Sequence, residues 1–227
     1  KEELLEYLSG DRAGLTHIVT LNAEMVVEAQ HNEQFKNIIS RAEIVIPDGS
    51  SMFWAREYLE RAGKTPGVWA LTPGVEEARK IIFSLIKFFF SHHTPLTGVD
   101  TIFDICEIIE KKNGTVYLLG GKPAEAEKTS EILHKKYPKL NVSITPSGSP
   151  FVRGRERRRI PLLTKEGLGE VSALFVALGS PKQTLWIEDN REALEESGIK
   201  IAMGVGGAFA MISGTLPRAP QWMRRRH

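Results

Sequence analysis

Short β-branched and aliphatic segments alternate with helical patterns along most of the chain. The strand-like segments are 17–21, 43–47, 115–119, 140–144, 172–178 and 199–203. The helical patterns are about 23–40, 50–61, 75–91, 99–112, 123–137, 181–196 and 207–213. Such alternation indicates a parallel sheet with helices on both faces. We therefore predict an α/β fold with a Rossmann-like, mostly parallel sheet, as one domain over 1–227 or as two closely fused lobes.

The composition limits the class of protein. Hydrophobic residues make up 41% and charged residues 26% of the 227 residues, ordinary values for a globular protein with a sizeable core. The net charge of +2 is too small to indicate a nucleic-acid partner. A single cysteine, Cys106, fits a reducing cytoplasm. Residues 1–16 lack the apolar core of a secretory signal, so a cytoplasmic location is expected.

Two segments, 63–74 and 146–169, carry the turn residues typical of loops. The longest apolar run, 81–90 (IIFSLIKFFF), is far shorter than the roughly 20 residues that span a bilayer. It is either a buried amphipathic helix or a helix at a membrane interface or subunit contact, because three successive phenylalanines cover more than one helical face. The second interpretation would allow a homo-oligomer.

Polar side chains follow the first two predicted strands. Thr20 and Asn22 end the first strand, and Asp48 follows the second. In open α/β sheets, ligands bind outside the carboxyl ends of the strands, so this placement favours an enzyme. Helix capping is the structural alternative for two of these residues: Asn22 would cap the helix that follows it, and Asp48 a helix starting near Ser50.

Three further strand ends carry glycines. They are Gly120-Gly121, Gly179-Ser180-Pro181 and Gly204-Val205-Gly206-Gly207. Pro123 is predicted at the first position of one helix, and Ser180 as the N-cap with Pro181 at the first position of another. Unpaired amides and helix N-termini at one sheet edge suit an anionic phosphate, so a nucleotide or another diphosphate is the favoured ligand. Tight packing between helix and strand would also demand glycine.

The usual signatures of cofactor and metal binding are missing. Gly204-Val205-Gly206-Gly207 lacks the last spaced glycine of the dinucleotide fingerprint, and the chain holds neither a Walker A sequence nor an Asp-x-Asp pair. His92 and His93 are adjacent, so their side chains point apart and a metal site there is not expected. We expect no cofactor and no metal, with the diphosphate neutralised by amides, helix ends, Lys or Arg.

Five motifs in collinear order resemble the WecG/TagA/CpsF glycosyltransferases. They are Thr20-Leu-Asn22-Ala-Glu24-Met25, Pro47-Asp48-Gly49, Tyr117-Leu-Leu-Gly120-Gly121, Ala177-Leu-Gly179-Ser-Pro181-Lys182-Gln183 and Gly204-Val-Gly206-Gly207-Ala-Phe209, followed by Arg218-Ala-Pro220. The resemblance implies an inverting, metal-independent transferase at the cytoplasmic membrane face. It would move an N-acetylmannosamine-type sugar from UDP to undecaprenyl-diphosphate-linked N-acetylglucosamine, as in teichoic acid linkage-unit synthesis. Relatives also use the uronic acid of that sugar, or glucose.

The resemblance also implies roles for individual residues. Asp48 matches the proposed catalytic Asp of the family and would take a proton from the acceptor hydroxyl. Thr20 and Asn22 would position the substrate or Asp48, and Gln183 would contact the sugar or the diphosphate. The nucleotide-sugar site would comprise Gly120, Gly121, Lys182, Gly204, Gly206 and Gly207. Lys182 would offset phosphate charge, although a lysine at a helix start is often only solvated.

Several positions depart from the family pattern. Ser50-Ser51-Met52 replaces a turn that usually holds glycine, Thr94-Pro95-Leu96 stands where an arginine is typical, and 63–93 contains an insertion. Ala210 stands where an Asp is common, and the chain ends at His227 without the usual basic, aromatic tail. A truncated or diverged relative, weakened in catalysis but able to bind a UDP-sugar, is therefore the alternative.

Arginines cluster at 153–159 and 224–226. Their structural explanation is a solvated loop and a frayed terminus. Their functional explanation is attraction to anionic lipid headgroups, at about 1 kcal/mol per residue, or to the diphosphate of the acceptor. No interleaved aromatic residues accompany them, so RNA is not the expected partner.

Overall fold

The computed structural model describes residues 14–49, 97–145 and 172–218, with single positions at 6, 10, 51, 52 and 55. Several predictions therefore lie outside the described residues. They are most of the helix at 50–61, the helix at 75–91 with the apolar run 81–90, the two loops, His92-His93 and both arginine clusters.

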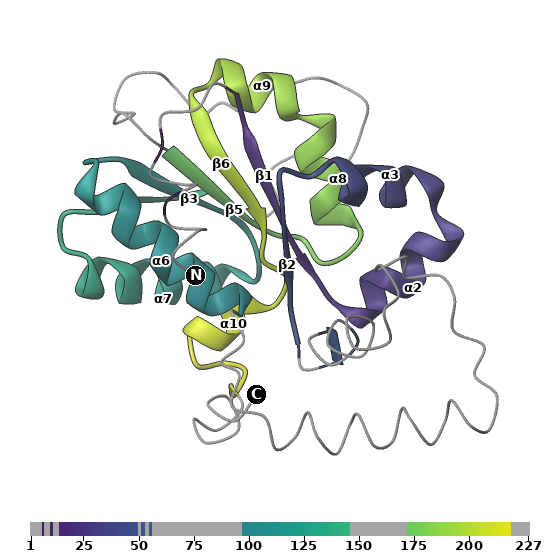
Figure 1. Cartoon of the computed structure of the whole chain (residues 1–227). Coiled ribbons are helices and arrows are strands. Elements are labelled where there is room, and N and C mark those ends of the chain that lie inside the picture. Colours follow the sequence, from purple (N-terminus) through teal and green to yellow (C-terminus); the bar gives the residue numbers. More distant parts are fainter. Residues whose placement is uncertain are drawn as a thin grey trace.

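The described part of the chain forms a six-stranded parallel sheet in the order β2-β1-β6-β5-β3-β4 (Figure 1). The strands are β1 (Thr16–Leu21), β2 (Ile44–Pro47), β3 (Thr115–Gly120), β4 (Asn141–Thr145), β5 (Ser172–Ala177) and β6 (Ile199–Gly204). Each lies within one residue of its predicted bounds. The predicted α/β fold with a Rossmann-like parallel sheet is confirmed.

Helices cover both faces of the sheet. They are α2 (Ala23–His31), α3 (Glu33–Arg41), α6 (Gly98–Lys111), α7 (Pro123–Lys136), α8 (Lys182–Asp189), α9 (Arg191–Glu196) and α10 (Ala208–Ile212). One face is covered by α6, α7 and α10, and the other by α2, α3, α8 and α9 (Figure 1). Crossovers between parallel strands are right-handed, so the direction in which the chain crosses the sheet decides which face the connecting helix covers. The chain moves in one direction from β1 to β2 and from β5 to β6, and in the opposite direction from β3 to β4.

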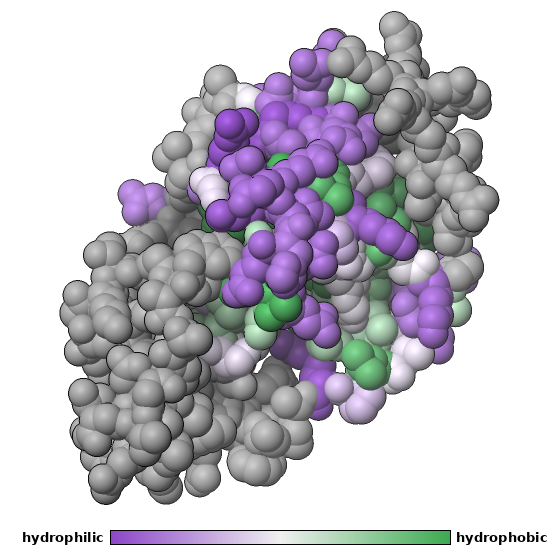
Figure 2. Space-filling view, turned by 90° about the vertical axis from the view of Figure 1, so that its right-hand side faces the viewer, coloured by the Kyte–Doolittle hydropathy of each residue, from purple (hydrophilic) through white to green (hydrophobic). Residues whose placement is uncertain are grey.

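Successive strand residues alternate between the two layers. On β3, Val116 and Leu118 belong to the core under α6, α7 and α10, whereas Tyr117 and Leu119 pack on the side of α8 and α9. A parallel sheet buried on both faces requires such continuous apolar strands. The outer surface on the side of α2, α3 and α8 is mostly hydrophilic, with hydrophobic side chains in smaller spots (Figure 2).

Two helical predictions were too long. The pattern at 23–40 is two helices, because Asn32 ends α2 and caps α3 by accepting a 3.0 Å hydrogen bond from the amide of Phe35. The pattern at 181–196 is likewise divided at Asn190 into α8 and α9. An asparagine competes for backbone hydrogen bonds and so favours caps over helix interiors.

The predicted start of α8 was also wrong. The helix begins at Lys182, and Pro181 rather than Ser180 occupies the N-cap position, after a cis Ser180–Pro181 bond. The Pro181 carbonyl accepts from the amide of Leu185 at 3.1 Å, and the Gly179 carbonyl accepts from the amide of Gln183 at 2.9 Å. Pro123, by contrast, lies at the first position of α7 as predicted.

His17 is a buried titratable group in β1, away from the carboxyl ends of the strands. Its side chain is 0% exposed, and neither ring nitrogen has a hydrogen-bond partner among the described residues. Nδ1 lies 3.7 Å from Oε2 of Glu188, which is too far for a hydrogen bond. Burial lowers the pKa of His17 from 6.5 to about 4, although the charge of Glu188 opposes this shift.

We expect His17 to make the protein less stable in acid. The folded state keeps the imidazole of His17 neutral, whereas the unfolded chain takes up a proton as the pH falls below about 6.5. The free energy of unfolding is therefore unaffected by this group above pH 6.5 and decreases as the pH falls toward 4. The loss amounts to about 3 kcal/mol of unfolding free energy. Urea titrations between these pH values should show a flatter pH dependence for His17→Leu. The same change at exposed His31 is the control, and an unchanged slope in His17→Leu would contradict the prediction.

Candidate active site

Thr20 and Asp48 meet at the first turn of α6. Strands β1 and β2 end side by side, and the amide of Asp48 donates to the carbonyl of Leu21 at 2.7 Å. The Asp48 carboxylate accepts a long, 3.4 Å hydrogen bond from the amide of Gly98. A Cβ on Gly98 would lie 3.3 Å from Cγ2 of Thr20 and 3.6 Å from Oδ2 of Asp48. Both side chains therefore pack directly on this glycine.

Asp48 consequently lies at the N-terminus of α6. Gly98 is the first residue of that helix, and its amide has no partner within the helix. The aligned peptide dipoles favour negative charge at this end. The described contacts of Asp48 thus lead to α6, fifty residues further along the chain. Most of the helix predicted near Ser50 lies outside the described residues.

Thr20 and Gln183 fix the end of β6. The buried Thr20 hydroxyl donates to the carbonyl of Gly204 at 2.9 Å. Gln183, in the first turn of α8 as predicted, is 3% exposed, and its Oε1 accepts from the amide of Gly206 at 2.9 Å. A Cβ on Gly204 would lie 2.9 Å from Nε2 of Gln183, so the glycine makes room for this side chain. Thr20, which packs on Gly98 together with Asp48, therefore also holds the end of β6, and Gln183 holds the turn that follows it.

Two of the predicted glycines, at the end of β3, lie where a side chain would not fit. Gly120 and Gly121 have positive φ values, and a Cβ on Gly120 would lie only 2.6 Å from the carbonyl oxygen of Ala177. The Gly121 amide donates to that same oxygen at 2.9 Å. Packing against β5 is enough to explain Gly120, and packing against Phe209 of α10 is enough to explain Gly121.

At Gly179, Gly206 and Gly207 the space is open. A Cβ there would meet no described atom within 4 Å. Phe209, just beyond Gly207, lies against Gly121, which brings the turns after β6 and β3 together. The open glycines are therefore the places where a ligand can approach the backbone.

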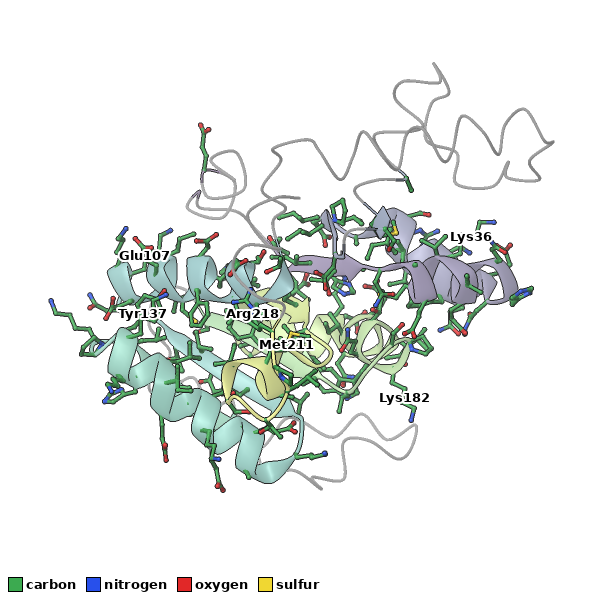
Figure 3. The ribbon with its side chains drawn as sticks, turned by 90° about the horizontal axis from the view of Figure 1, so that it is seen from below. Lys36, Glu107, Tyr137, Lys182, Met211 and Arg218 are labelled. Atoms are coloured by element: carbon green, nitrogen blue, oxygen red, sulfur yellow. The ribbon has the colours of Figure 1, made fainter. Side chains whose placement is uncertain are left out.

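The structure does not bring Asn22 and Lys182 into this arrangement. Asn22 caps α2 by accepting a 2.9 Å hydrogen bond from the amide of Met25, so the capping interpretation is confirmed. Lys182 is exposed and points outward, as Figure 3 shows looking from below onto the carboxyl ends of the strands. No hydrogen bond or ion pair joins it to the residues around Asp48 in the described part of the chain.

Sequence reasoning gave Gly98 no role at the site and missed a set of bonds at its side. The N-cap of α6, Thr97, accepts from the amide of Asp100 at 3.2 Å and donates to its Oδ2 at 2.6 Å. Arg218 donates from Nη2 to Thr97 Oγ1 at 3.1 Å and to Asp100 Oδ1 at 3.0 Å. The helix itself was predicted at 99–112, and the Thr-x-x-Asp spacing, a variant of the capping box, is the signal that could have identified Thr97 as its N-cap.

The described residues contain no group of three or more His, Cys, Asp or Glu side chains arranged to hold a metal ion. No described helix has the length and apolar character needed to cross a membrane.

A carboxylate, a hydroxyl and open glycine turns at the carboxyl edge of a parallel sheet define the class of site in which Rossmann-like enzymes bind nucleotides. The sequence model of the glycosyl transferase WecG/TagA/CpsF family matches residues 1–79 and 80–227, and the chain belongs to this family. It is 23% identical over 210 residues to an N-acetylglucosaminyldiphosphoundecaprenol N-acetyl-beta-D-mannosaminyltransferase of Bacillus spizizenii, with 92% of this chain and 67% of that protein covered. The resemblance found in the motifs is confirmed, and the protein is a glycosyltransferase.

Proposed function

We propose that the protein transfers N-acetylmannosamine from UDP to undecaprenyl-diphosphate-linked N-acetylglucosamine, the step that builds the linkage unit of teichoic acid. The family and the name of the Bacillus spizizenii relative support this donor and acceptor. The observation that carries the proposal is the position of Asp48. Its carboxylate lies at the sheet edge, at the start of α6, where it packs on Gly98 together with Thr20, whose hydroxyl holds the last residue of β6.

The reaction we propose is a single displacement with inversion. The acceptor hydroxyl attacks the anomeric carbon while Asp48 takes its proton, and UDP leaves from the opposite face of the sugar. Thr20 and Gln183 hold Gly204 and Gly206 in place, and the open Gly206-Gly207 turn lets the diphosphate approach the backbone. Asn22 at the start of α2, Gly120, Gly121 and Lys182 are proposed to line the outer part of the site.

We propose that the transfer needs no metal ion or cofactor. The charge of the departing UDP would be met by backbone amides, helix N-termini and basic side chains. The acceptor is a membrane lipid, so the proposed place of action is the inner face of the cytoplasmic membrane. The arginine clusters at 153–159 and 224–226 would attract its anionic headgroups. A single catalytic domain over 1–227 and a homo-oligomer are further parts of this proposal.

A donor screen tests the function. Purified protein would be mixed with a short-chain prenyl-diphosphate-linked N-acetylglucosamine and with UDP-N-acetylmannosamine, its uronic acid analogue or UDP-glucose, with and without EDTA. We expect disaccharide formation and UDP release with UDP-N-acetylmannosamine, at a rate unaffected by EDTA. Loss of activity with EDTA that Mg²⁺ restores would contradict metal independence, and transfer only from another donor would reassign the sugar.

One residue favours a second candidate function. Ala210, half-buried in α10 just beyond the Gly206-Gly207 turn, replaces an acidic residue of the family pattern. A protein that binds the UDP-sugar but transfers it weakly would fit this replacement. UDP binding in calorimetry without transfer from any of the three donors, in wild type and in Ala210→Asp alike, would favour the binding protein. Transfer gained in Ala210→Asp would instead identify a weakened enzyme.

A further inference from the structure

We propose that Arg218 is a positioning residue for Asp48. Through Thr97 and Asp100 it fixes the first turn of α6, and thereby the Gly98 amide that contacts the Asp48 carboxylate. This inference rests on the proposed function, in which Asp48 is the base. Figure 3 shows Arg218, in the segment that follows α10, beside α6.

The bonds to Thr97 use the whole capacity of its hydroxyl. A hydroxyl has one hydrogen to donate and two lone pairs that accept. The hydrogen goes to Asp100 Oδ2, and the lone pairs accept from the amide of Asp100 and from Arg218 Nη2. Arg218 at the same time donates to the other carboxylate oxygen of Asp100. The cap of α6 cannot rotate without breaking one of these bonds, so Arg218 fixes its orientation.

Arg218 affects position more than stability. The ion pair with Asp100 joins side chains that are 21% and 41% exposed. Such solvent-screened pairs contribute only about 0–1 kcal/mol to folding. The rest of α6 is held independently, because Ile102, Ile105 and Ile109 are fully buried in the core. Loss of Arg218 should therefore leave the fold intact and release only the first turn of α6.

Asp48 is sensitive to small movements of that turn. Its hydrogen bond to Gly98 is already long at 3.4 Å, and Thr20 and Asp48 both pack against the Cα of Gly98. A shift of the turn would change the direction of the carboxylate relative to the acceptor hydroxyl. Misplacement of a catalytic group by 1 Å can cost about 100-fold in rate.

The test is a double-mutant cycle in the full chain. Arg218→Met, Asp100→Asn and the double variant would be assayed for transfer, with Arg41→Met as the same change at an exposed arginine on α3. We expect kcat to fall by about 10- to 100-fold in each single variant, with no further loss in the double variant. The Kd for UDP and the melting temperature should match those of Arg41→Met.

Three outcomes would overturn the proposal. They are wild-type kcat in both single variants, a weakened Kd for UDP in Arg218→Met alone, and multiplicative losses in the double variant. The second and third would mean that Arg218 acts on the substrate directly. Asp48→Asn would be assayed in parallel to separate failure of the Arg218 proposal from failure of the proposed function. Wild-type transfer by Asp48→Asn would refute Asp48 as the base, whatever the Arg218 variants do.

Discussion

Asp48→Asn is expected to lose at least about 100-fold in kcat, within the range for removal of a general base. The amide keeps the size of the side chain and an oxygen that can accept from Gly98, but it cannot take a proton from the acceptor hydroxyl. The fold and the affinity for UDP should therefore be retained. Steady-state transfer assays would measure kcat, and calorimetry would measure UDP binding.

A matched control for this variant is Asp189→Asn. Asp189 is exposed at the end of α8, so the same loss of one carboxylate there should leave kcat unchanged. Wild-type-like transfer by Asp48→Asn would refute the assignment of the base. A similar loss of kcat in both variants would point to net charge rather than to proton transfer.

Gly120→Ala is expected to be the most destabilising single change among the glycine turns. Its new Cβ would lie 2.6 Å from the backbone oxygen of Ala177, and its φ of +85° disfavours any residue with a Cβ. Overpacking costs about 1–3 kcal/mol and the left-handed conformation about 1–2 kcal/mol, so we expect a loss of about 3 kcal/mol or more in unfolding free energy. Urea denaturation of the purified variant would measure it.

Gly179→Ala separates the two contributions. Gly179 has a similar φ of +75°, but a Cβ there would meet no described atom within 4 Å. This variant should lose only the conformational part, about 1 kcal/mol. Equal losses in the two variants would contradict the packing explanation for Gly120.

The central strands were predictable because they are short, apolar runs rich in β-branched residues. Burial on both faces imposes this pattern, and β5 is the clearest case, with every residue from Ser172 to Ala177 buried. The helix breaks at Asn32 and Asn190 were missed because the apolar period continues across them. Asn32 ends α2 by capping α3, whereas the Asn190 side chain donates to the carbonyl of Trp186 at the end of α8.

The site was only partly predictable. Thr20 and Asp48 could be placed at the sheet edge because each follows a strand. Gly98 and Arg218 could not be connected to them, since Arg218 contacts Thr97 across 121 positions. That contact depends on the strand order, which places β6 beside β1, and spacing along the chain does not determine this order. The sequence also does not show that Gly120 is required by packing whereas the space beside Gly206 is open.

The most direct measurement is a crystal structure of Asp48→Asn with UDP-N-acetylmannosamine bound. We predict that the diphosphate lies against the Gly206-Gly207 turn, with the anomeric carbon facing residue 48 across the space beside Thr20. A nucleotide bound at the opposite edge of the sheet, beside His17, or a residue 48 that points away from the sugar, would contradict this account.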